Sequence, residues 1–203
     1  MLRNHAVRSL ELSGRRVRLA TLVEADYPAW LEVRNRCRDW LVRWEPRSKG
    51  APHPTEDQSS FSARCAMRER ERELGSGFGF GIFYEGRFAG EVTLSSIQRG
   101  PFQNGSIGYW IDQDVAGLGL TPEAVVVVLQ FAFETLRLHR VEVAIIPRNS
   151  SSRRVADKLQ LRNEGTAIGF LEINGEWEDH VRYAMISEEW AARAGELRAA
   201  WLD

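Results

Sequence analysis

The sequence predicts an α/β domain, in which a mixed and mostly antiparallel sheet of about seven strands carries helices on both faces. Two observations favour this fold class. Three strand-like segments follow one another in the middle of the chain, and strands then alternate with helix-like segments. The length of 203 residues and the apolar content of 43% suit one domain with a sizeable core.

The N-terminal part of the chain predicts a strand, a helix and a loop. Residues 14–22, "GRRVRLATL", alternate polar and apolar side chains as a half-buried strand does. Residues 24–42 predict a helix that breaks near Trp44. Residues 45–57 are rich in proline and glycine, which indicates a loop.

The next segments predict a helix and a β-hairpin. We expect Thr55 to cap a helix that runs to about Leu74, because Glu56 and Asp57 then lie in its first turn. Two strand-like runs follow, and the Glu85-Gly86 pair between them is typical of a hairpin turn.

The second half alternates strands and helices. Asn174-Gly175 is a strong hairpin signal, and Ser187 begins a C-terminal helix with acidic residues in its first turn. The expected elements are a strand at 105–112, a helix at 122–136, a strand at 140–146, a helix at 151–161 and strands at 166–175 and 176–186.

Composition argues against several classes of function. The net charge of −1 gives no overall field that would draw the chain to nucleic acid or to a membrane. Cys37 and Cys65 are isolated, so they provide neither a disulfide framework nor zinc-ligand spacing. Residues 1–19 lack the apolar core of a secretory signal, and the longest apolar run, 124–129, cannot cross a bilayer. We expect a cytoplasmic protein without a metal.

One segment suggests an anion site. In "GYWIDQDVAGLGLTPEAVVVV", residues 108–128, we expect Thr121 to cap a helix with Pro122 in its first position. The N–H groups of residues 117–121 are then free, and Gly117 and Gly119 let an anion approach the backbone. The alternative is a tight strand-to-helix connection. The segment lacks the third glycine of a dinucleotide fingerprint and the Gly-Lys-Ser/Thr of a P-loop.

A second polar group follows the next strand, in "IPRNSSSRRVADKLQL". Asn149 offers both a donor and an acceptor, and Ser152 offers a hydroxyl. The alternative is an ordinary helix cap.

Together these segments resemble the GNAT superfamily of N-acetyltransferases. The acetyl-CoA motif R/Q-G-x-G-x-G/A reads here from Ala116 to Thr121, with both glycines present and no side-chain donor at Ala116. The chain is most similar to RimJ/RimL-type ribosomal-protein N-terminal acetyltransferases, and W-x-D-H at residues 177–180 looks closer to RimJ. The other matching segments are "LVRWEP", "IGYWID", "LHRVEV", "NSSSRRVADKL" and "INGEWEDHVRYAM".

The resemblance implies a domain at residues 15–187, an N-terminal extension at 1–14 and a C-terminal helix at 188–203. It implies acetyl-CoA as co-substrate, held in a splayed sheet where the strand near Trp110 and Ile111 pairs with pantetheine and an N–H faces the thioester oxygen. Ser152 would help the thiolate leave, and position 156, where many relatives carry a Tyr acid, is Ala. The implied cofactor-binding residues are Trp110, Ile111, Gly117, Leu118, Gly119, Leu120, Thr121, Asn149 and Ser152.

The general base is open. The resemblance places a RimL-type Glu at Leu171, so the neighbouring Glu172 would face the other side of its strand. Glu91 and Glu142 are the other strand carboxylates considered, each with a structural alternative. His180, with Asp179, is another candidate, and a water chain can also accept the proton.

The implied reaction is acetylation of a protein N-terminal α-amine, with a ribosomal protein as first candidate, by direct attack in a ternary complex. Trp44 and Asp179 are the expected substrate contacts, while Tyr109, Trp110 and Trp177 are expected in the core. The alternatives are a small-molecule amine acetyltransferase, for aminoglycosides or polyamines, and an inactive CoA-binding regulator. A homodimer is left open.

Overall fold

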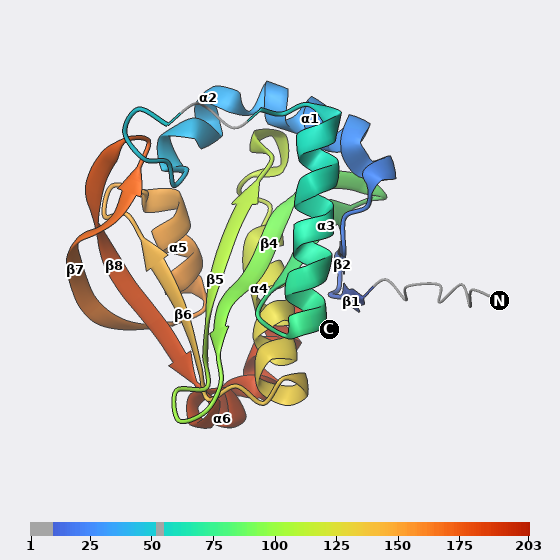
Figure 1. Ribbon diagram of the computed structural model, residues 1–203. Helices are drawn as coiled ribbons and strands as arrows, with labels where there is room; N and C mark the ends of the chain where they lie inside the picture. The colour runs from blue at the N-terminus through green and yellow to red at the C-terminus, as the bar shows by residue number, and fades with distance from the viewer. Residues whose placement is uncertain (1–9, 52–54) are drawn as a thin grey trace.

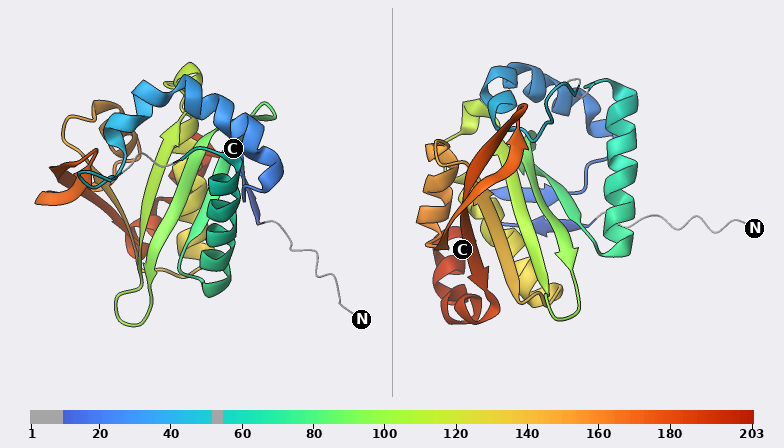
Figure 2. Two further views of the ribbon diagram at one scale, coloured as in Figure 1. Left: turned by 45° about the horizontal axis from the view of Figure 1, so that its top comes forward. Right: turned by 60° about the vertical axis from the view of Figure 1, so that its left-hand side comes forward.

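The computed structural model describes residues 10–51 and 55–203, and it contains one eight-stranded mixed sheet in the order β1-β2-β3-β4-β5-β6-β8-β7. Figures 1 and 2 show helices on both faces of this sheet. The strands are β1 Glu11–Ser13, β2 Val17–Ala20, β3 Phe78–Tyr84, β4 Arg87–Gln98, β5 Asn104–Ile111, β6 Arg140–Ile145, β7 Arg162–Ile173 and β8 Glu176–Ile186. The α-helices are α1 Tyr27–Arg36, α2 Arg38–Leu41, α3 Gln58–Leu74, α4 Leu120–Gln130, α5 Ser150–Lys158 and α6 Ser187–Trp201.

The predicted fold class is confirmed, with one strand more than expected. The additional strand, β1, has three residues, which is too short for an alternating pattern to reveal it. Every neighbouring pair is antiparallel except β5 and β6.

The sheet opens between β5 and β6, as expected. These two strands pair in parallel only from Asn104 opposite Arg140 to Ser106 opposite Glu142. Beyond Ser106, β5 continues to Ile111 paired with β4 alone. In Figure 1 the two strands lie together at their lower ends and separate toward α1 and α2. The outer half of β5 therefore has a free edge inside the sheet.

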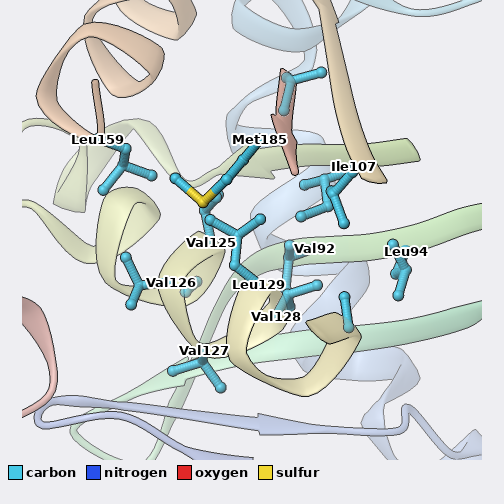
Figure 3. Close-up of a cluster of buried hydrophobic side chains, with 14 of the residues drawn as sticks. Val92, Leu94, Ile107, Val125, Val126, Val127, Val128, Leu129, Leu159 and Met185 are labelled. Atoms are coloured by element: carbon cyan, nitrogen blue, oxygen red, sulfur yellow. The ribbon is translucent and has the colours of Figure 1, made fainter. Parts of the chain in front are cut away.

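Two apolar clusters hold the layers together. The larger one joins the sheet to α4, α5 and α6, and residues from Leu120 to Leu129 of α4 are all buried. Figure 3 shows part of this cluster, with Val92, Leu94 and Ile107 of the sheet beside the valines of α4. The smaller one packs α1 and α3 on the opposite face. The burial of α4 on all sides fixes the position of its N-terminus relative to the sheet.

Both expected hairpin turns are present. Glu85-Gly86 has φ values of 49° and 77°, and Asn174-Gly175 has values of 47° and 91°. Positive φ at both central residues is the signature of a type I′ turn, which fits the twist of the adjoining strands.

Three local expectations were wrong. The cap of α3 is Asp57, whose Oδ1 accepts the Ser60 N–H at 2.8 Å, and not Thr55. The segment at 24–42 is not one helix, because the chain leaves helical geometry at Cys37, where φ is −97° and ψ is 10°. Trp177 is 68% exposed rather than in the core, because it lies at the start of β8, where β8 pairs with β7 and not with β6.

Candidate active site

A cavity of about 1240 Å³ lies where the sheet opens. One side consists of the outer half of β5, the glycine turn and the start of α5. The other side consists of α1, α2, α3 and the segment after α2. The sequence-predicted residues that line it are Trp44, Glu91, Trp110, Ile111, Gly117, Gly119, Leu120, Thr121, Asn149 and Ser152.

The glycine turn presents free backbone donors. Gly117 and Gly119 have φ values of 88° and 85°, a conformation that favours glycine. Gly119 caps α4, so the helix begins at Leu120 and the expected cap at Thr121 was wrong. Within residues 10–51 and 55–203, no acceptor is found for the N–H groups of Gly117, Gly119, Leu120 and Thr121. Amides at the positive end of a helix dipole suit a diphosphate.

The free edge of β5 identifies which amide faces the opening. The Asp112 N–H donates to the Ala89 carbonyl on β4 at 2.7 Å. Because backbone groups alternate in direction along a strand, the Trp110 N–H also points to β4 and the Ile111 N–H points into the opening. The donor expected near Trp110–Ile111 is therefore that of Ile111.

Ser152 is held by two neighbours. The Asn149 Oδ1 accepts the Ser152 N–H at 3.1 Å, so Asn149 is the cap of α5 as well as a cavity residue. The Ser152 hydroxyl donates to the Tyr109 phenol oxygen at 2.9 Å. Burial raises the pKa of Tyr109 above its usual range, and the Ser152 hydrogen bond opposes this only in part, so the phenol stays protonated.

Glu91 is the one predicted base that lines the cavity. Its Cα pairs across the sheet with that of Trp110, next to Ile111. Glu91 is 7% exposed, and its carboxylate accepts hydrogen bonds from Trp30 Nε1 at 2.8 Å and from Arg64 Nη1 at 3.0 and 3.1 Å. Trp30 and Arg64 thus fix the position of the Glu91 carboxylate next to β5, the strand that carries the free Ile111 N–H.

Four other predicted residues lie outside the cavity lining. Glu142 binds Arg140 and Arg182 on the sheet, and Glu172 accepts the Lys49 N–H. Asp179 accepts the Gly169 N–H at 2.8 Å and holds a bulge in β7.

Leu118, the fourth of these residues, is 50% exposed. It lies between Gly117 and Gly119 without facing the cavity. The side chains of Glu142, Glu172, Asp179 and Leu118 thus lie outside the cavity lining, and the roles expected of these residues stay predictions.

The segment after α2 is paired with the tip of the β7–β8 hairpin. Arg47 N–H donates to the Glu172 carbonyl at 3.0 Å, Asn174 N–H to the Glu45 carbonyl at 3.0 Å and Gly175 N–H to the Arg47 carbonyl at 2.7 Å. These bonds form a strap of residues 45–49 beside the cavity.

The cavity wall carries more cations than carboxylates. Glu45 and Glu56 both pair with Arg34, and Glu56 also lies 3.7 Å from Arg38. Glu91 pairs with Arg64, so each carboxylate has a cationic partner. Seven cationic residues face three carboxylates around the lining, and the cations are Arg34, Arg43, Arg64, Arg68, Arg148, Arg154 and Lys158.

Sequence reasoning missed Tyr109, Arg34 and Arg64. Tyr109 has a weak signal, because strand alternation places it on the face opposite Trp110, toward α5. Arg34 lies one helical turn after Trp30, which is a common spacing on any helix. Its guanidinium lies over both Trp30 and Trp110, at 5.7 and 5.6 Å from the ring centres.

A sheet that opens beside free amides at a helix N-terminus suits a long ligand with a diphosphate, as coenzyme A is. The chain belongs to the acetyltransferase (GNAT) domain family, which matches residues 16–162. It is therefore an acetyl-CoA-dependent N-acetyltransferase of the GNAT type.

Three relatives illustrate this similarity. The "Probable N-acetyltransferase YjcK" of Bacillus subtilis is 41% identical over 111 residues, 54% of this chain and 61% of that protein. The [ribosomal protein uS5]-alanine N-acetyltransferase of Escherichia coli is 32% identical over 178 residues, 85% of this chain and 90% of that enzyme. RimJ of Mycobacterium smegmatis, solved in complex with CoA-disulfide, is 28% identical with a TM-score of 0.86, and the match covers 95% of this chain and 93% of that one.

The described residues contain neither a cluster of metal-ligating side chains nor a membrane-spanning helix. In residues 10–51 and 55–203 there is no group of three or more His, Cys, Asp or Glu side chains arranged to hold a metal ion. The helices in the same residues are all too short or too polar to span a membrane.

Proposed function

We propose that this protein acetylates the N-terminal α-amine of a protein, with a ribosomal protein as first candidate acceptor. The relatives named for ribosomal-protein alanine acetylation support this acceptor class, and such an acceptor would place the reaction in the cytoplasm. The observation that carries the proposal is the excess of cations around the cavity. An α-ammonium with a pKa of about 7.7–8.0 loses its proton easily, whereas a lysine or a polyamine keeps its charge and is repelled.

The residues around the opening fit acetyl-CoA. The free amides of Gly117, Gly119, Leu120 and Thr121 would hold the diphosphate, and the free edge of β5 would pair with the pantetheine amides. Asn149 has its Oδ1 committed to Ser152 and retains its NH2 group for a ligand carbonyl. Leu118 contributes its backbone to the turn and no side-chain contact.

Three groups would act on the reacting atoms. The Ile111 N–H would donate to the thioester oxygen as negative charge develops there. Glu91 would accept the proton of the acceptor amine through a water molecule. As the new N–C bond forms and the C–S bond breaks, the Ser152 hydroxyl would turn its hydrogen from the Tyr109 oxygen to the departing sulfur, and coenzyme A would leave as the thiolate. Direct attack needs no acyl-enzyme, and neither Cys37 nor Cys65 lines the cavity.

The alternatives have less support. A polyamine or aminoglycoside acceptor calls for an acidic pocket, yet Glu142 and Glu172 lie outside the cavity and Glu91 is paired with Arg64. An inactive CoA-binding protein is suggested by Ala at position 156 in place of a Tyr acid and by Leu171 in place of the RimL-type Glu. The hydroxyls of Ser152 and Tyr109 at the opening offer another proton donor, and Glu91 offers another carboxylate.

The proposal is tested by measuring thiol release from acetyl-CoA with three sets of acceptors. The first set is peptides with a free Ala or Ser N-terminus, and the second is the same peptides with a blocked N-terminus and an internal Lys. The third set is polyamines and aminoglycosides. We expect turnover with the first set alone, and mass spectrometry should place the acetyl group on the α-amine. Preferential turnover of polyamines would overturn the acceptor class. Binding of acetyl-CoA without turnover of any amine would favour the inactive binding protein.

A further inference from the structure

A buried carboxylate behind the glycine turn has no part in the chemistry described above. Glu123 lies in the first turn of α4 and is 0% exposed. Its Oε1 accepts the backbone N–H groups of Arg16 and Val17, and its Oε2 accepts the Arg16 Nε–H at 2.9 Å. This carboxylate therefore joins the start of β2 to α4, the helix that follows the glycine turn.

The same arginine reaches the turn itself. Arg16 Nη1 donates to the Leu118 carbonyl at 2.9 Å, and Leu118 stands between Gly117 and Gly119. Glycines have wide conformational freedom, so this turn does not hold its own shape. One planar guanidinium thus spans from Glu123 to the middle of the turn.

The direction of this hydrogen bond determines where the adjacent donor points. In a trans peptide unit the C=O and the following N–H point in opposite directions. When Arg16 holds the Leu118 carbonyl, the Gly119 N–H of the same peptide unit is directed away from Arg16. Gly119 lines the cavity and Arg16 does not, so this N–H points toward the ligand side.

The side chains of Arg16 and Trp201 fill the space next to Gly119 in the glycine turn. A Cβ added to Gly119 would lie 3.3 Å from Arg16 Nη2 and 3.5 Å from the Trp201 ring. Arg16 also cancels the charge of Glu123, which otherwise would oppose an anion bound at the start of α4.

We infer that Arg16 is a positioning residue for the coenzyme, which orients the Gly119 amide through the Leu118 carbonyl and neutralises Glu123 without touching the ligand. The inference rests on the proposed binding of acetyl-CoA by the glycine turn. It does not depend on the acceptor or on the identity of the base.

The test compares coenzyme A binding by calorimetry with thermal unfolding for a matched set of variants. Lysine at position 16 supplies a charge for Glu123, but a single ammonium cannot also span to the Leu118 carbonyl. We expect R16K to raise the Kd for coenzyme A about tenfold with kcat unchanged and Tm nearly unchanged. R18A, which breaks the exposed ion pair between Arg18 of β2 and Glu11 of β1, should match the wild type in both measurements.

A second pair of variants covers the case in which loss of Arg16 unfolds the protein. E123Q keeps one oxygen as acceptor for the N–H groups of Arg16 and Val17 but loses the acceptor of the Arg16 Nε–H. The hydrogen bond from Arg16 Nη1 to the Leu118 carbonyl does not involve Glu123, so the Kd should stay near the wild-type value. R16A/E123Q removes the buried charge together with the anchor, and its Kd should rise about tenfold. If R16K and R16A/E123Q both bound coenzyme A with the wild-type Kd, the positioning role of Arg16 would be overturned. The proposed function would not be affected by that result. Failure of the wild type to bind coenzyme A would overturn the proposed function, and this inference with it.

Discussion

The Ser152 hydroxyl donates to the Tyr109 phenol oxygen at 2.9 Å, and the Tyr109 hydroxyl donates to the Ser152 backbone carbonyl at 3.2 Å. The two residues are 43 positions apart and come from β5 and from α5, the helix that follows β6. The pair fixes the serine hydroxyl beside the free edge of β5. Under the proposed mechanism, Tyr109 would act through Ser152, as a positioning residue.

Replacement of Tyr109 by Phe should lower kcat about tenfold and leave the Kd for coenzyme A unchanged, because the phenol orients Ser152 and does not grip the coenzyme. S152A should show a similar loss. The double variant should be no slower than S152A alone, since both changes remove one function. Steady-state kinetics and calorimetry measure these quantities, and Y84F on β3 is the matched control. Additive losses in the double variant would contradict this coupling.

Replacement of Glu91 by Gln should lower kcat by at least about 100-fold, because the amide cannot accept the proton of the amine. The amide retains an acceptor for Trp30 and Arg64, so we expect only a small change in Tm. The matched control is E142Q, which alters a carboxylate outside the cavity and should keep the wild-type kcat. If E91Q and E142Q were equally active, Glu91 would be an anchor for Trp30 and Arg64 only.

Much of the coenzyme side could be predicted from sequence because its signals are local. Two glycines before a helix, and Asn149 three residues before Ser152, each lie within a few positions of one another. The start of α4 was misjudged by two residues, because Gly119 takes a positive φ and becomes the cap that Thr121 was expected to be.

The acceptor side could not be predicted in the same way because it depends on partners far apart in the chain. Glu91 and Glu142 are both strand carboxylates, and only the fold shows that Arg64 meets one inside the cavity while Arg182 meets the other outside it. The contact between Arg16 and Glu123 spans 107 positions, which no local pattern encodes.

Replacement of Gly119 by Ala should weaken coenzyme A binding at least about tenfold. A Cβ is strained at a φ of 85°, and it would also press on Arg16 at 3.3 Å. Calorimetry measures the Kd, and chemical unfolding measures the free energy of unfolding. G175A is the matched control, because Gly175 has a φ of 91° in the β7–β8 turn outside the cavity lining. It should lose stability by about 1–2 kcal/mol and keep its Kd. Equal Kd values for the two variants would contradict a role for the turn in binding.

The ion pairs on β6 and β7 should make stability depend on acid. The Arg140 guanidinium, with a smaller contribution from Arg162, lowers the pKa of Glu164 from 4.5 to about 2. In the unfolded chain Glu164 takes up its proton near pH 4.5, so below that pH the unfolded state binds more protons than the folded state does. The contribution of the Glu164 ion pairs to the free energy of unfolding is complete above pH 4.5 and is lost as the pH falls through about 2.

Urea unfolding between pH 7 and pH 2 should therefore show a difference in the free energy of unfolding between wild type and E164Q that shrinks toward zero at the acid end. E176Q removes an exposed carboxylate of β8 and should follow the wild-type profile. A difference between wild type and E164Q that does not change with pH would show that Glu164 acts through packing instead of charge.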